Sequence, residues 1–123
     1  MTILIVDDTE MSAQLMRVIL ESAGYETAQA TDGAAALSRL EDGPTPDLIL
    51  CDVQMPGMSG LEFVQAVKQR PEWAAIPIVM CTVSTDADTV RQAVALGCAG
   101  YVVKPVNGPA LLKKVGELLG QAA

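Results

Sequence analysis

Several short runs of apolar residues occur along the chain, separated by longer amphipathic segments. The runs Ile3–Val6, Leu48–Cys51 and Ile78–Cys81 consist almost entirely of hydrophobic residues. Continuous runs of this length are typical of parallel strands that helices cover on both faces, whereas surface strands alternate between apolar and polar residues. We therefore predict strands at 3–6, 25–30, 47–51, 77–81 and 101–103.

The segments between these strands have the length and the end signals of helices. Between Met11 and Ala23, apolar residues recur at intervals of three and four, and Gly24 follows as a suitable left-handed cap. Ser59 can cap a helix that runs through Gln69, and Pro109 suits the first turn of a last helix. We predict helices at 11–23, 33–40, 59–69, 85–96 and 109–119.

The alternation of five strands with five helices predicts one α/β domain over residues 1–123. Parallel strands joined by right-handed crossovers place helices on both faces of the sheet. The expected fold is therefore a doubly wound five-stranded parallel sheet. In such folds ligands bind beyond the carboxyl ends of the strands.

Residues capable of chemistry follow four of the predicted strands directly. They are Asp7, Asp8, Asp52, Thr82 and Lys104. Each alone has a simpler explanation, such as a helix cap or a turn. Because the carboxyl ends of parallel strands share one edge, however, the sequence predicts that three carboxylates, a hydroxyl and an ammonium gather there.

Three carboxylates at one edge repel one another and need positive charge nearby. A pair about 4 Å apart costs on the order of 4 kcal/mol at an effective dielectric constant near 20. Lys104 supplies one charge, and Mg2+, or Mn2+ in its place, suits a site of carboxylates, carbonyl oxygen and water. This arrangement favours phosphoryl transfer, with Asp52 as nucleophile because it is a single acid ending the central strand. The adjacent Asp7 and Asp8 are better suited to hold the metal.

Composition excludes several other classes of function. The chain has no histidine, which removes histidine acid–base catalysis, imidazole metal ligation and phosphohistidine chemistry on this chain. Its net charge is −7, and Lys113-Lys114 is the only adjacent basic pair, so direct nucleic-acid binding is not expected. No apolar run approaches the roughly 18 residues that span a membrane.

The start of the chain and its cysteines indicate the compartment. The segment from Met1 to Asp7 has no basic leader, so we expect a cytoplasmic protein. Cys51, Cys81 and Cys98 are odd in number and widely spaced, as expected for small hydrophobic residues in a reducing environment. A zinc site is not expected.

These features resemble the receiver domains of bacterial two-component response regulators, of the chemotaxis-regulator type. The resemblance covers essentially the whole chain. Its motifs are Val6-Asp7-Asp8, Cys51-Asp52 followed by Met55-Pro56-Gly57-Met58-Ser59-Gly60, Thr82, and Gly100-Tyr101-Val102-Val103-Lys104-Pro105.

The resemblance implies a flavodoxin-like fold with strand order 2-1-3-4-5 and a phosphoacceptor role for Asp52. The phosphoryl group would come from the phosphohistidine of a sensor histidine kinase or from a phosphotransfer protein. Asp8, Asp52 and the backbone carbonyl of Gln54 would bind Mg2+ directly, and Asp7 would act mainly through water. Thr82 and Lys104 would contact the phosphoryl oxygens.

The resemblance also implies a conformational switch. Tyr101 occupies the switch position, although an ordinary aromatic residue at a sheet edge is the simpler interpretation. The bond before Pro105 would be cis. A downstream effector protein would bind the face of the helix at 85–96, the strand at 101–103 and the helix at 109–119, around Val94, Tyr101, Val103 and Lys113. We further expect a stand-alone relay rather than a dedicated enzyme, monomeric, or dimeric when phosphorylated; the alternative is that the chain is a fragment of a longer regulator.

The chain departs from the family pattern at two positions. Val83 stands where a small residue is usual, and we expect its bulk to restrict access of phosphodonor or water. Val106 stands where phenylalanine is common. Gln54 and Ser84 occupy positions that tune dephosphorylation. Neither departure removes a chemical group.

Two alternatives remain open from the residues. An aspartate-nucleophile phosphatase of the haloacid dehalogenase type also uses Mg2+ and a lysine, but it needs an Asp-x-Asp motif that Asp7-Asp8-Thr9 lacks. A receiver that is not phosphorylated and only binds partners is disfavoured, because the acids, Thr82 and Lys104 are all present.

Overall fold

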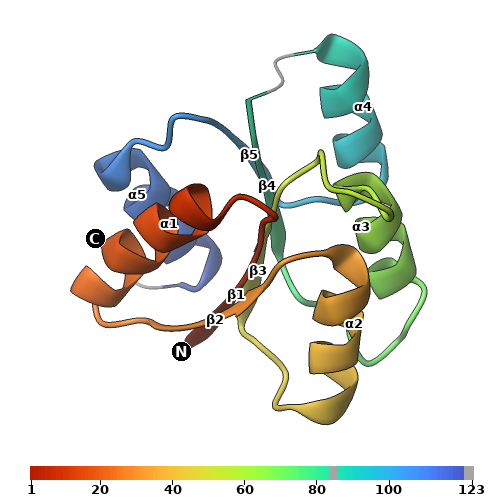
Figure 1. Cartoon of the computed structure of the whole chain (residues 1–123), viewed down its shortest axis with the longest axis horizontal. Helices are drawn as coiled ribbons and strands as arrows, with labels where there is room; N and C mark the ends of the chain where they lie inside the picture. The colour runs from red at the N-terminus through yellow and green to blue at the C-terminus, as the bar shows by residue number, and fades with distance from the viewer. Residues whose placement is uncertain (84–85, 121–123) are drawn as a thin grey trace.

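The computed structural model describes residues 1–83 and 86–120 as one parallel sheet with helices on both faces (Figure 1). The strands are β1 (Thr2–Val6), β2 (Glu26–Ala30), β3 (Leu48–Cys51), β4 (Ile78–Thr82) and β5 (Gly100–Val103). The helices are α1 (Glu10–Ser22), α2 (Gly33–Asp42), α3 (Gly60–Lys68), α4 (Ala87–Ala95) and α5 (Gly108–Leu118). The predicted elements are confirmed, with shifts of a few residues at their ends.

The strand order is β2-β1-β3-β4-β5, and every neighbouring pair is parallel. This confirms the predicted doubly wound, flavodoxin-like fold. Strand β3 lies at the centre, with Cys51 opposite Val6 of β1 on one side and opposite Met80 of β4 on the other. The residue that follows β3 therefore emerges at the middle of the carboxyl edge.

Two hydrophobic cores cover the two faces of the sheet, which explains why the strands are continuously apolar. Helices α1 and α5 lie on one face, and α2, α3 and α4 lie on the other (Figure 1). In β1, Ile3 and Ile5 point into the first core, while Leu4 and Val6 point into the second. All four are at most 2 % exposed, so every position of the strand needs an apolar side chain.

Helix α1 is confirmed, but most of the apolar residues that predicted it face solvent. Met11, Leu15 and Val18 are 84 %, 47 % and 55 % exposed. The buried residues of α1 are Ala13, Met16 and Leu20. The helix thus carries two apolar stripes, and periodicity alone does not decide which of them packs on the sheet.

The helices begin at residues that can cap them, with one exception. The side chains of Asp32, Ser59, Asp86 and Asn107 each accept a backbone N–H at the start of α2, α3, α4 and α5. Thr9, at the start of α1, makes no side-chain cap bond. The predicted start of the fourth helix, Thr85, lies outside the described residues, as does Ser84; the described helix begins after Asp86.

The structure also places the cysteines. Cys51 and Cys81 are buried free thiols, as predicted, while Cys98 is partly exposed. Among the described residues, no helix is long and apolar enough to cross a membrane.

Candidate functional site

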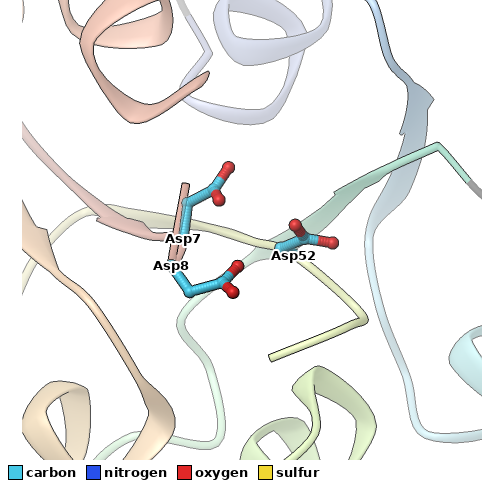
Figure 2. Close-up of side chains that lie close together, drawn as sticks. All are labelled: Asp7, Asp8 and Asp52. Atoms are coloured by element: carbon cyan, nitrogen blue, oxygen red, sulfur yellow. The ribbon is translucent and has the colours of Figure 1, made fainter. Parts of the chain in front are cut away.

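Three carboxylates meet at the carboxyl edge of the sheet, beyond β1 and β3 (Figure 2). The backbone N–H of Asp52 donates to the carbonyl of Val6 at 2.9 Å, which extends the pairing of β1 and β3 by one residue. Asp7, Asp8 and Asp52 each offer one carboxylate oxygen, and these three atoms lie within 4.8 Å of one another. The predicted convergence of the acids is confirmed.

The adjacent acids Asp7 and Asp8 occupy different environments. Their side chains leave the chain in different directions (Figure 2), and Asp7 is 2 % exposed while Asp8 faces solvent. Asp7 Oδ1 accepts the backbone N–H of Thr9 at 2.8 Å. Asp7 is therefore fixed within the fold, whereas the carboxylate of Asp8 is accessible to a ligand.

Lys104, which follows β5, reaches across the edge to two of the acids. Its Nζ lies 2.6 Å from Asp7 Oδ2 and 3.0 Å from Asp52 Oδ2. Burial alone would lower the pKa of Lys104, but the hydrogen bonds to Asp7 and Asp52 outweigh it and raise the pKa above its ordinary value. The ammonium therefore stays charged at neutral pH and offsets part of the repulsion among the carboxylates.

Both carboxylate oxygens of Asp52 are oriented by hydrogen-bond donors. Oδ1 accepts the backbone N–H of Gln54 at 3.2 Å, and Oδ2 accepts from Lys104. Asp52 is 8 % exposed and lines a cavity of about 760 Å³ that opens to solvent. A carboxylate that is oriented by donors and faces an open cavity can act as a nucleophile toward a molecule bound there.

Gly60 packs closely against the backbone of Asp52, a contact that the sequence motif around Gly60 did not predict. A Cβ atom at Gly60 would lie 2.0 Å from the carbonyl oxygen of Asp52. The N–H of Gly60 donates to the carbonyl of Val53 at 2.7 Å. Helix α3 therefore starts directly against the backbone of Asp52, and only glycine fits this approach.

Thr82 and Pro105 complete the edge on the side of β4 and β5. Thr82 is the fully buried last residue of β4, and its carbonyl accepts the N–H of Lys104 at 2.8 Å. The Lys104–Pro105 bond is cis, as the resemblance implied. Tyr101 lies on β5 opposite Met80, where it packs partly buried against the core beneath α3 and α4.

The donor set fits a hard divalent cation. Asp7, Asp8 and Asp52 offer carboxylate oxygens, and Gln54 lines the same cavity as Asp8 and Asp52. Oxygen ligands of this kind suit Mg2+ or Mn2+, and no cysteine or histidine belongs to the group to favour zinc.

The cavity has further lining residues that sequence reasoning did not assign to the site. They are Thr9, Ser12, Val53, Met55 and Ser59. Val83, singled out from sequence for its bulk, also lines the cavity and is 65 % exposed. Thr9 and Ser12 follow the end of β1, and Val53, Met55 and Ser59 follow the end of β3, by two to eight positions. Attention to the polar residues directly after each strand therefore did not find them.

Comparisons with known proteins agree with this geometry. A family model described as the response regulator receiver domain matches residues 3–116. The polar-differentiation response regulator DivK of Brucella anthropi is 35 % identical over 124 residues, which cover 98 % of each chain.

Solved structures give the same result. The chemotaxis protein CheY4 of Vibrio cholerae is 37 % identical with a TM-score of 0.88, over 95 % of this chain and 97 % of that one. A CheY-like response regulator receiver domain protein of Methanospirillum hungatei is 32 % identical with a TM-score of 0.86, over 97 % and 93 % of the two chains.

Proposed function

Because this chain belongs to the response regulator receiver family, we propose that Asp52 is its phosphoacceptor and that residues 1–123 act as one receiver domain. The observation that supports the proposal is the environment of the Asp52 carboxylate. Its carboxylate ends the central strand, is oriented by Gln54 and Lys104, and lies beside Asp7 and Asp8. Receiver domains are generally signalling domains rather than dedicated enzymes.

In the proposed reaction an oxygen of Asp52 attacks phosphorus in line with the departing group. The O–P bond to Asp52 forms while the bond to the donor atom breaks, and the donor takes the electron pair. Lys104 and Thr82 contact the phosphoryl oxygens and stabilise their charge. Asp8, Asp52 and the Gln54 carbonyl would hold Mg2+, or Mn2+, with Asp7 acting mainly through water; the ion supplies further neutralisation of phosphoryl charge.

The phosphodonor is proposed to be a sensor histidine kinase or a phosphotransfer protein. This chain contains no histidine, so a phosphohistidine donor has to come from another protein. Such signalling would take place in the cytoplasm and would require no contact with nucleic acid or membrane.

The output surface is proposed to be the face of α4, β5 and α5, recognised by a downstream effector protein. Two apolar side chains of this face are exposed, Val94 at 67 % and Val103 at 44 %. Tyr101 precedes Val103 by two positions on β5, so the two side chains point to the same side of that strand, and a change in the position of the Tyr101 ring would alter this surface. The chain would act as a monomer, or as a dimer when phosphorylated, by a shift between two conformations.

The competing functions lack support. Nothing in the comparisons favours a haloacid dehalogenase-type phosphatase, and Asp7-Asp8-Thr9 does not supply the Asp-x-Asp motif of that class. A receiver without phosphorylation would have no need of an intact acidic site with Lys104 held between two carboxylates.

Incubation with phosphoramidate and Mg2+, followed by intact mass spectrometry, tests the proposal. We expect a gain of one phosphoryl group that is lost at alkaline pH and is absent with EDTA. Phosphate release from a panel of phosphoesters is measured in parallel. Sustained turnover of those esters without a stable adduct would favour the phosphatase instead.

A further inference from the structure

Asn107 is the only asparagine in the chain, and Gly108 follows it directly. A glycine in this position favours deamidation of the asparagine, because it has no side chain to hinder attack of its own backbone nitrogen on the neighbouring amide. Asn107 is exposed to solvent and lies where the segment that follows Lys104 enters α5. The chain therefore carries a single asparagine amide, in a reactive sequence and close to the acidic site.

In the folded chain this amide has a structural role as the N-cap of α5. Oδ1 of Asn107 accepts the backbone N–H of Ala110 at 3.0 Å, and the backbone carbonyl of Asn107 accepts the N–H of Leu111 at 2.9 Å. Leu111 is completely buried in the core on the α1 and α5 side of the sheet. Asn107 thus connects an exposed amide to the buried first turn of α5.

The backbone conformation of Asn107 keeps its side-chain amide away from the attacking nitrogen. Formation of the succinimide ring joins Gly108 N to Asn107 Cγ, which requires that nitrogen to eclipse Cβ about the Cα–C bond. In an L-residue the eclipsed arrangement has a negative ψ, whereas ψ of Asn107 is 121°. Rotation to the reactive conformation would also break the bonds from Ala110 and Leu111. The reaction therefore requires the start of α5 to open.

We infer that Asn107 is a site of non-enzymatic modification, at which opening of the start of α5 becomes a permanent change in the chain. The N–H of Gly108, at the first position of α5, has no acceptor within the helix and can lose its proton to hydroxide. The nitrogen attacks Cγ of Asn107, so the N–Cγ bond forms and the Cγ–Nδ2 bond breaks. Nδ2 takes a proton from water and leaves as ammonia, which restores the hydroxide.

Water then opens the succinimide ring at either of its carbonyls. Cleavage at Cγ gives aspartate with an unchanged main chain, and its carboxylate can still cap α5, where negative charge is favourable. Cleavage at the main-chain carbonyl gives isoaspartate, in which the main chain runs through Cβ. Isoaspartate therefore lengthens the connection between Lys104 and the buried Leu111, and it disrupts the cap geometry.

The consequence for the acidic site follows from Lys104, which precedes Asn107 by three residues. Its Nζ lies 2.6 Å from Asp7 Oδ2 and 3.0 Å from Asp52 Oδ2, so a shift of the chain after β5 alters both contacts. A chain with isoaspartate at this position is a poorer phosphoacceptor. This consequence rests on the proposed role of Asp52, whereas the modification itself does not.

The test uses the whole folded chain, incubated at mildly alkaline pH and analysed by peptide mass mapping. An isoaspartate-specific carboxyl methyltransferase with labelled S-adenosylmethionine distinguishes isoaspartate from aspartate. Asn107→Ser keeps a capping side chain but has no amide. Gly108→Ala hinders the attack and should fold, because its Cβ would meet Ile19 at 3.8 Å. Asp32-Gly33 and Asp42-Gly43 can isomerise without a gain in mass, so the mapping separates them.

We expect a gain in mass on the peptide that contains Asn107, with isoaspartate among the products. Unfolding in urea should accelerate it at least about tenfold, because the folded chain has to lose its cap bond and enter a sparsely populated backbone region first. Gly108→Ala should slow the reaction several-fold, and Asn107→Ser should gain no mass at this position.

The deamidated fraction, isolated by ion exchange, is compared with Asn107→Asp, which represents the product with an unchanged main chain. We expect the deamidated fraction to unfold at a lower temperature than Asn107→Asp and to accept a phosphoryl group from phosphoramidate several-fold more slowly. Asn107→Asp should resemble the wild type in both measurements, because its carboxylate retains the cap.

No mass gain at Asn107 in the folded chain, or equal rates in the folded chain and in urea, would overturn the inference. A deamidated fraction as stable as Asn107→Asp would show that isoaspartate does not disturb the start of α5. Normal labelling of that fraction would overturn the effect on the site alone. Failure of the unmodified wild type to label would overturn the phosphoacceptor assignment and leave the modification at Asn107 standing.

Discussion

Lys104 Nζ lies 3.0 Å from Asp52 Oδ2, although the two residues follow strands that are not neighbours in the sheet. Strand β4 separates β3 from β5, and the lysine side chain reaches over the buried end of β4 to join them. The same ammonium contacts Asp7 beyond β1. One residue thus joins three strand ends at the site.

We predict that Lys104→Met destabilises the metal-free protein by about 3 kcal/mol, because a buried ion pair that loses one partner leaves an uncompensated charge. The side chain of Asp7 is completely buried and cannot recover hydration. Urea unfolding in EDTA measures the loss, and added Mg2+ should restore part of it. Lys113→Met, at an exposed position of α5, is the control and should change stability by less than about 0.5 kcal/mol. Equal effects of the two substitutions would contradict the account.

We predict that Asp8→Asn stabilises the metal-free protein but reduces the further stabilisation that Mg2+ provides. Removing one of three neighbouring carboxylates relieves repulsion, so we expect the metal-free protein to gain about 0.5–1.5 kcal/mol, less than the pairwise Coulomb energy because Asp8 is exposed. A ligand that binds only the folded state stabilises it according to its affinity. Because the variant should bind Mg2+ weakly, the stabilisation by Mg2+ should largely disappear. Thermal unfolding over a Mg2+ titration measures both effects. Asp42→Asn, an exposed acid on α2 away from the edge, should keep the full response to Mg2+.

Gly60→Ala should damage both stability and phosphorylation. Its Cβ would come within 2.0 Å of the Asp52 carbonyl oxygen, so α3 or the backbone of Asp52 has to move. We expect a loss of several kcal/mol on unfolding and a slower reaction with phosphoramidate in the fraction that remains folded. Gly108→Ala is the matched control, because its Cβ would meet Ile19 at 3.8 Å, an ordinary contact. A Gly60→Ala protein as stable and reactive as Gly108→Ala would show that the close approach does not constrain Asp52.

Stability should fall at alkaline pH because of buried thiols. Burial raises the pKa of Cys81 from its ordinary value of 9.0 to about 12. The folded state then holds its proton while the unfolded state loses it, so the stabilisation is complete below about pH 9 and is lost between about pH 9 and 12. Three pKa units correspond to about 4 kcal/mol.

Urea unfolding at several pH values, with wild type and Cys81→Ala, tests this effect. The substitution leaves a small cavity that lowers stability at every pH, but it should make the decline above pH 9 less steep. Cys51, whose pKa burial also raises, should account for part of the remaining decline. Parallel curves for the two proteins would rule out Cys81 as a source of the pH dependence.

Most of the fold could be predicted because its signals are local. Leu48–Cys51 is apolar at every position since helices cover both faces of β3, and Asp52 follows where the chain leaves the core. Because the strands are parallel, Asp7, Asp8 and Asp52 are predicted at one edge from the sequence alone. The acidic site follows from strand order and strand ends.

The features that could not be predicted depend on packing between distant elements. The contact of Lys104 with both Asp7 and Asp52 depends on how its side chain extends over the end of β4. The approach of Gly60 to Asp52 depends on where α3 docks, and the buried stripe of α1 depends on how that helix rotates on the sheet. None of these leaves a periodic signal in the sequence.

The most direct test of the account is to locate the phosphoryl group. The wild-type chain is treated with phosphoramidate and Mg2+, reduced with borohydride, which converts an aspartyl phosphate to homoserine, and digested for peptide mass mapping. We expect homoserine at position 52 and no label on Asp52→Asn. Label on Asp7 or Asp8, or label that persists on Asp52→Asn, would contradict it.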